Sequence, residues 1–158
     1  MNKKLGLLFA VLGIAVIAFA AVNLSGNKDK AGITIISGDN EVVVAWDEIA
    51  LEDFSGELVN GKGEVTASDY EGIELVELLA ANGIKFDDNS EIVVTAEDNY
   101  SATLTGAEVL TGQRVYVALS ANGEMVEGLE GGQGAQLIVF GDPNSKRAVR
   151  CMKTIEIK

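Results

Sequence analysis

The sequence predicts an α+β domain that is mainly β, with one main helix near residues 73–82. Short runs rich in valine, isoleucine and threonine alternate with turn-forming stretches along most of the chain, which is typical of a β-rich fold. Only one segment places its apolar residues at helical spacing. With 158 residues, 47% of them apolar, the chain is long enough to bury one well-packed core.

The strands are predicted from the turns that separate them. Two strands surround the turn at Asp39 and Asn40. The pair Asn60-Gly61 lies between β-forming residues and is typical of a hairpin turn or a tight loop. Another turn is expected at residues 121–124. The predicted strands are residues 32–38, 41–46, 91–96, 100–104, 114–120, 135–140 and 148–157.

The one predicted helix follows from the spacing of its leucines. Leu75, Leu78 and Leu79 recur at the three- and four-residue steps that put side chains on one helix face, while the intervening glutamates face water. Asn82-Gly83 is expected to end the helix, because both residue types accept the left-handed backbone that follows a helix.

Residues 1–22 are expected to direct the chain out of the cytoplasm. Lys3 and Lys4 precede a run, residues 5–22, in which every residue is apolar or glycine. This length lies on the border between a cleaved signal peptide, with an Ala-x-Ala site ending at Ala20, and an N-terminal membrane anchor. Both alternatives stay open, and both make the protein extracytoplasmic, secreted or membrane-anchored at the cell surface. Residues 23–31 are predicted to be a tether, and residues 32–158 the folded domain.

Composition excludes several classes of protein. Residues 31–158 hold 8 basic and 23 acidic side chains, so nucleic acid is not an expected partner of this domain. The sequence contains no histidine, which removes Ser-His-Asp catalysis and imidazole-ligated zinc or iron. Cys151 is the single cysteine, so the chain can form neither an intramolecular disulfide nor a Cys-x-x-Cys site.

Several segments follow one another in the order and spacing of a known family. The first begins at Tyr70 and reads aromatic-x-Gly-Ile-x-Leu-x-x-Leu-Leu, the second contains the turn that ends at Tyr100, and the last is a strand that carries Lys153. With the segments between them, they resemble the molybdopterin-binding domain of sulfite oxidase-like oxidoreductases over roughly residues 33–158. The resemblance implies the sulfite oxidase-like molybdopterin-binding domain fold.

The resemblance also implies where a cofactor would bind, and it shows what this chain lacks. Enzymes of the family ligate molybdenum through a cysteine just before the first motif, whereas the matching residues 61–69 contain none. They bind the pterin phosphate with histidine and arginine side chains, and this chain has no histidine. No metal ligand and no catalytic residue is therefore predicted. The candidate cofactor-binding residues, taken from the motifs and from the only arginine ahead of the C-terminal basic cluster, are Tyr70, Asp98, Tyr100 and Arg114.

Three further features are each open to two interpretations. Asn99 stands where the family has glycine and is expected at a positive φ, in a turn that is either structural or part of a functional cleft. Cys151 is expected to share a strand face with Val149 and Ile155, as a buried small apolar residue or as a reactive thiol. The basic cluster in residues 146–158 either offsets the acidic domain or binds an anionic ligand or an acidic partner.

Two functions are compatible with this sequence. The favoured one is an exported, non-catalytic binding or interaction module that keeps the sulfite oxidase-like fold without molybdenum, because the chain supplies no metal ligand set and no nucleophile paired with a base. The alternative is an oxidoreductase component that binds a molybdopterin or another redox cofactor. The expected partner is a small molecule or a protein, and also the membrane if residues 5–22 are retained.

Overall fold

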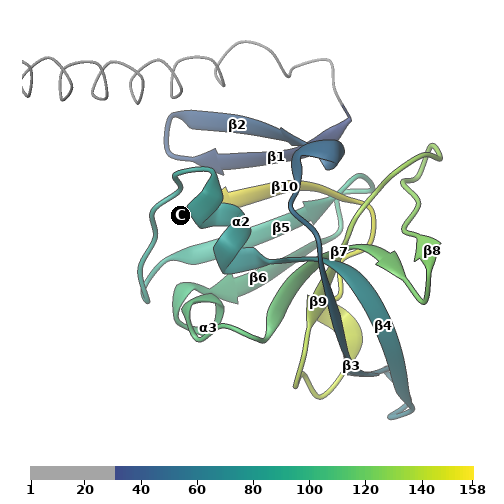
Figure 1. The fold of residues 1–158 in the computed structure, drawn as a ribbon. Helices are drawn as coiled ribbons and strands as arrows, with labels where there is room; N and C mark the ends of the chain where they lie inside the picture. Colours follow the sequence, from purple (N-terminus) through teal and green to yellow (C-terminus); the bar gives the residue numbers. More distant parts are fainter. Residues whose placement is uncertain (1–30) are drawn as a thin grey trace, which may run out of the picture. The chain divides into compact units, whose positions relative to one another are not determined.

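Two five-stranded β-sheets organise residues 31–158, the part of the chain that this computed structural model describes (Figure 1). The first sheet has the strand order β2-β1-β10-β5-β6. Its neighbouring strands are antiparallel except β1 and β10, which pair in parallel and join the two ends of the domain. Its strands are β1 (Gly32–Ser37), β2 (Asn40–Ala45), β5 (Glu91–Ala96), β6 (Ser101–Thr105) and β10 (Met152–Ile157).

The second sheet is built around β7, which pairs with β4 on one side and with β8 and β9 on the other. The hairpin of β3 and β4 forms the opposite edge of this sheet, and Figure 1 shows it extending away from the first sheet. All pairings in this sheet are antiparallel. The strands are β3 (Glu52–Val59), β4 (Val65–Glu74), β7 (Val115–Ala121), β8 (Glu124–Met125) and β9 (Gln136–Val139).

One hydrophobic core joins the two sheets. Ile35, Ile92 and Ile155 of the first sheet and Val117 and Leu137 of the second are fully buried members of the same cluster. In β1 and β5 buried residues recur at every second position, so one face of the first sheet is buried, whereas β7 and β9 bury residues at consecutive positions. Each such side chain stabilises the fold by roughly 1.5–3 kcal/mol relative to an exposed one.

A second, smaller cluster covers the other face of the β3-β4-β7-β9 sheet. Tyr70, Ala118 and Ile138 are buried there. Phe54 stacks on Tyr116 with ring centroids 4.1 Å apart and an interplanar angle of 17°. Because both faces of this sheet bury side chains, its second face supplies a rigid base on which a binding site can be built.

The predicted helix is confirmed as α2 (Leu75–Ala81), whose three leucines are buried in the main core. It begins two residues later than predicted, because Ile73 and Glu74 are still paired with β7 at the end of β4. Asn82 caps the helix, and Gly83 follows at φ 71°, as expected for this pair.

A second short helix, α3 (Gly106–Leu110), was not predicted. It is fixed by a capping box in which the Thr105 side chain accepts a hydrogen bond from the Glu108 N–H and the Glu108 side chain accepts one from the Thr105 N–H. The Thr-x-x-Glu spacing of this box is present in the sequence. Five residues are too few for a helical hydrophobic period to be recognised, so only the capping signal could have found it.

The predicted Asn60-Gly61 turn is confirmed as a tight loop between β3 and β4. The Asn60 side-chain oxygen accepts hydrogen bonds from the N–H groups of Lys62 and Glu64, at 2.8 and 3.0 Å. The loop thus includes residues 60–64, since β4 begins only at Val65.

The strand predicted at residues 148–157 is wrong at its start. β10 begins only at Met152, and Cys151 lies before it with φ 51°, half-buried, with its Sγ 3.4 Å from the Glu127 carbonyl oxygen. A left-handed residue interrupts the two-residue alternation of a strand, so Cys151 does not share a face with Val149 and Ile155. The adjacent segment from Asn144 contains the short 3-10 helix η2 (Ser145–Arg147).

No helix within residues 31–158 is long and apolar enough to cross a membrane. The predicted leader at residues 1–22 and nearly all of the predicted tether lie outside the described residues.

Candidate functional site

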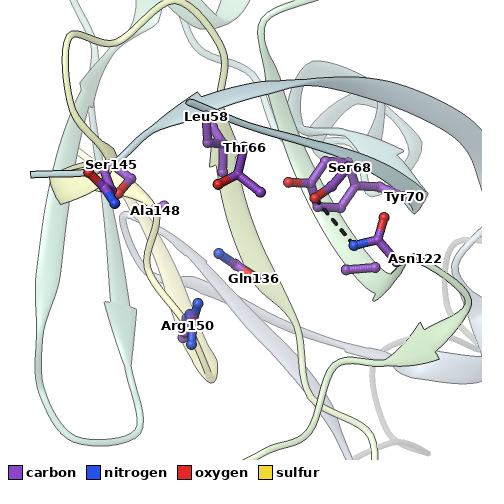
Figure 2. Close-up of a pocket in the computed structure, with 11 residues that line it drawn as sticks. Leu58, Thr66, Ser68, Tyr70, Asn122, Gln136, Ser145, Ala148 and Arg150 are labelled. Carbon is purple, nitrogen blue, oxygen red and sulfur yellow. Dashed lines mark hydrogen bonds between the residues drawn. The ribbon is translucent and has the colours of Figure 1, made fainter. Parts of the chain in front are cut away.

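A pocket of about 390 Å³ lies on the second face of the β3-β4-β7-β9 sheet, and we refer to it as the β4 pocket (Figure 2). Strands β3, β4, β7 and β9 contribute to its lining, and the segment around η2 closes it from the other side. Arg150 is its only charged lining residue. The lining residues are Leu58, Asn60, Thr66, Ser68, Tyr70, Ala121, Asn122, Gln136, Ser145, Ala148 and Arg150.

Strand β4 supplies three hydroxyl groups to this pocket by simple alternation. Thr66, Ser68 and Tyr70 are separated by two residues each, so their side chains leave the strand on the same face. Thr66 and Ser68 belong to residues 61–69, the segment in which no metal-ligating cysteine was predicted.

A β-bulge brings the end of β7 into the same pocket. Gly72 pairs with Ala118, but Glu71 pairs with Ser120, so Leu119 is an extra residue on β7. Leu119 is buried in the main core, and Ala121 beyond it belongs to the second cluster with Tyr70. The bulge therefore changes which β7 residues face the pocket, a common use of bulges near functional sites.

Asn122 holds the rim of the pocket in place. Its side-chain oxygen accepts a hydrogen bond from the Asp69 N–H at 3.0 Å, and its amide nitrogen donates to the Ser68 hydroxyl at 3.3 Å, the contact drawn in Figure 2. Asn122 has φ 53° and begins the turn with Gly123 that was expected here. Both Asn122 and Ser68 are therefore engaged within the protein.

The η2 wall of the pocket is held in place by two sets of contacts. The Tyr100 hydroxyl donates a hydrogen bond to the Lys146 carbonyl oxygen at 2.5 Å. The Arg147 guanidinium donates to both carboxylate oxygens of Asp142, at 2.8 and 2.5 Å, and to Glu108 at 3.0 Å. Since Glu108 also caps α3, Arg147 connects the pocket wall to that helix.

The charges of this network stabilise one another. Burial alone would raise the pKa of the Asp142 and Glu108 carboxyls, but hydrogen bonds and charge from Arg147 outweigh it and hold both pKa values below their ordinary ranges. The same contacts raise the pKa of Arg147. Arg114 joins the network through Asp142, at 3.1 Å.

The structure separates the four predicted cofactor-binding residues. Tyr70 lines the β4 pocket, whereas Asp98, Tyr100 and Arg114 do not. Tyr100 contacts Lys146 of η2, Arg114 contacts Asp142 ahead of η2, and Asp98 lies in the turn between β5 and β6. A cofactor-binding role for these residues stays a prediction.

Sequence reasoning did not select the other polar groups of the pocket. The alternating hydroxyls at Thr66 and Ser68 ahead of Tyr70 were a usable signal, because residues two apart on one strand share a face. Gln136 offered no local signal, and Arg150 was noted only as part of the basic cluster, since only the fold brings these two residues to β4.

The C-terminal basic cluster divides between the two interpretations left open. Arg147 is paired with acidic side chains, and Lys158 lies 3.3 Å from Glu156. Arg150, by contrast, lines the β4 pocket. Within this cluster, a ligand-binding role is therefore best suited to Arg150.

The positive φ predicted for Asn99 is confirmed, at 68°. Its N–H donates to the Ala96 carbonyl oxygen at 3.0 Å, and the Asp98 side chain accepts a hydrogen bond from the Tyr100 N–H at 3.0 Å. These contacts are those of a tight turn that Asn99 closes.

Substitutions at Asn99 should separate backbone strain from other effects. Asn99→Gly is expected to be neutral or slightly stabilising, whereas Asn99→Val should lower the free energy of unfolding by roughly 1–2 kcal/mol, because a branched Cβ meets the following carbonyl at positive φ. Urea denaturation of both variants measures this difference. Equal effects of the two substitutions would contradict the strain argument.

The donor groups of the pocket do not fit molybdenum. Among residues 31–158, no group of three His, Cys, Asp or Glu side chains is placed to hold a metal ion. Cys151 lines a different hollow, beside Glu127. Burial and the nearby carboxylates of Glu97 and Asp98 raise the pKa of its thiol, which disfavours the thiolate that a metal requires.

No family model and no curated protein matches this chain. Among solved structures, it is similar to the sulfane dehydrogenase SoxCD from Paracoccus pantotrophus, with a TM-score of 0.64 at 16% sequence identity. The match covers 85% of this chain and 40% of that chain, so this protein spans less than half the length of the structure it matches. The domain therefore has a distant molybdopterin-oxidoreductase-like fold, and the predicted sulfite oxidase-like fold class is confirmed.

Proposed function

We propose that this protein is an exported, non-catalytic binding module that keeps a molybdopterin-oxidoreductase-like fold without molybdenum. The observation that carries this proposal is the donor set of the β4 pocket, which consists of hydroxyls, amides and one guanidinium. Thiolates are soft ligands, and the oxygens of Thr66 and Ser68 do not replace a sulfur bond that fixes the metal. The pocket is instead suited to a small polar ligand held by hydrogen bonds.

The position of Cys151 supports the same proposal. Its Sγ faces the Glu127 carbonyl oxygen, and it lines another hollow rather than the β4 pocket. The raised pKa of this thiol further lowers the thiolate fraction at neutral pH. The only sulfur nucleophile in the chain is therefore poorly placed to ligate a metal in the β4 pocket.

We expect the protein to purify without molybdenum and to be inactive toward sulfite or sulfoxides. The test is elemental analysis after expression with molybdate in a host that makes the cofactor, with Cys151→Ser prepared in parallel. Near-stoichiometric molybdenum that survives Cys151→Ser would show that the pocket oxygens suffice as ligands. Molybdenum that disappears in this variant would identify Cys151 as a ligand. Either result overturns the proposal, and a co-purifying pterin or flavin would favour an oxidoreductase component.

Export is tested by fractionation of cells that express the full-length chain. A retained anchor keeps the protein with membranes through high-salt and alkaline washes, whereas cleavage releases a chain that starts at Ala21. N-terminal sequencing distinguishes these two outcomes. Full-length protein in the soluble cytoplasmic fraction would contradict export.

A further inference from the structure

Several polar groups of the β4 pocket have no hydrogen-bond partner within residues 31–158. These groups are the side chains of Thr66, Tyr70, Gln136 and Ser145, which lie around one hollow in Figure 2. Tyr70 is the most informative, because only 7% of the residue is exposed while its hydroxyl is not among the fully buried atoms without a partner, so the hydroxyl opens to the hollow. Its ring is fixed by the aromatic cluster, so the hydroxyl is held in place at the pocket. A ligand that occupies this pocket must supply hydrogen bonds to several neutral groups.

Arg150 adds one positive charge at the edge of this polar surface. It lines the pocket together with Gln136 and makes no ion pair within the described part of the chain. Arg114 and Arg147, by contrast, are both paired with Asp142. A free guanidinium binds a carboxylate through two parallel hydrogen bonds. An anionic group on the ligand is therefore favoured at Arg150, although the domain as a whole is acidic.

The lining of the pocket also disfavours other classes of ligand. No aspartate or glutamate lines it, so the ammonium group of an amino acid or a peptide would have no counter-ion. A phosphate ester carries about two negative charges, and a single guanidinium neutralises only one of them. A purely apolar ligand would bury the hydroxyls of Thr66 and Tyr70 without partners.

We infer that the β4 pocket binds a small polyhydroxylated carboxylate of the sugar-acid type, with its carboxylate on Arg150 and its hydroxyls on Thr66, Tyr70 and Gln136. The volume of about 390 Å³ lies at the lower end of the range for small-molecule sites, as such a ligand requires. This inference rests on the proposed function and names the ligand class of the same site.

Three probes of similar length test separately whether the pocket binds the carboxylate and whether it binds the hydroxyls of the ligand. D-gluconate carries a carboxylate and hydroxyls, sorbitol carries only hydroxyls, and hexanoate carries only the carboxylate. Isothermal titration calorimetry with the purified exported protein is expected to show gluconate binding at least about tenfold more tightly than either of the others. Binding of 6-phosphogluconate should be no tighter than that of gluconate, because Arg150 supplies a single charge.

Two variants and one control measure how much Arg150 and Tyr70 contribute to gluconate binding. Arg150→Gln should weaken gluconate binding about tenfold, to near the level of sorbitol, and leave sorbitol binding unchanged. Lys153→Gln is the matched control, because it removes the same charge from an exposed position on β10 that does not line the pocket. Tyr70→Phe keeps the aromatic packing and should weaken gluconate and sorbitol about equally, without affecting hexanoate.

Each contrary outcome overturns the inference. Equal affinity for gluconate and hexanoate would show that the pocket does not bind the hydroxyls. Equal losses of gluconate affinity in Arg150→Gln and Lys153→Gln would show that Arg150 has no specific role. The absence of gluconate binding would overturn the ligand class as a whole. Molybdenum analysis of the same preparation distinguishes this inference from the proposed function. Protein that is free of metal and does not bind gluconate contradicts only the inference about the ligand.

Discussion

Gly72→Ala is expected to lower the free energy of unfolding by about 2–4 kcal/mol. A Cβ at Gly72 would lie 2.1 Å from the Val117 carbonyl oxygen and 2.8 Å from the Cα of Ala118. Both atoms belong to the backbone of the paired strand β7, so they cannot move aside without disturbing the β4–β7 ladder at its bulge. Urea denaturation followed by far-UV circular dichroism measures the loss.

Gly61→Ala is the matched control for this variant. Gly61 lies in the loop between β3 and β4, and a Cβ there would have no neighbour within 4 Å. Its substitution is expected to change stability by less than about 0.5 kcal/mol. A comparable loss from both substitutions would show that glycine flexibility, rather than the contact with β7, explains the effect.

Arg147→Met is expected to lower the free energy of unfolding by about 2–3 kcal/mol at neutral pH. The variant keeps most of the apolar stem but removes the hydrogen bonds to Asp142 and Glu108. The Asp142 and Glu108 side chains are only 9% and 16% exposed, so water replaces the lost partner poorly. Denaturant unfolding measures the loss, and Asp142→Asn combined with Arg147→Met should cost less than the sum of the single substitutions.

The pH dependence of stability provides a second readout of this network. Folding lowers the pKa of Glu108 and Asp142 below their ordinary values of 4.5 and 3.8. As pH falls through those values, the unfolded chain takes up protons first, so the wild-type protein should lose stability progressively on acidification. Arg147→Met should lose less over the same range, because its carboxylates lack the guanidinium. Parallel pH profiles for the two proteins would contradict the assigned role of Arg147.

Much of the fold could be predicted because local patterns encode it. The leucine spacing of α2 and the stop at Asn82-Gly83 depend only on neighbouring residues, and the positive φ of Asn99 follows from the turn that contains it. The capping box of Thr105 and Glu108 is an equally local pattern. Cys151 was misplaced because its left-handed backbone interrupts the alternating pattern of residues 148–157 before β10 begins.

The β4 pocket depends on contacts that no local pattern encodes. Thr66 and Tyr70 share a face through the alternation of one strand, and this part was readable in the sequence. Gln136 and Arg150 reach the same pocket only because β9 pairs with β7 and the chain then returns past η2 toward β10. The bulge at Leu119 is likewise a property of the β4–β7 pairing.

The sequence by itself therefore determined the fold class, the main helix and the presence of a single cysteine and no histidine. Only the tertiary structure decided that Tyr70 lines a pocket while Tyr100 contacts Lys146 and Arg114 contacts Asp142. The physical reason is that strand pairing brings together residues far apart in the chain, and neither composition nor periodicity specifies which strands pair.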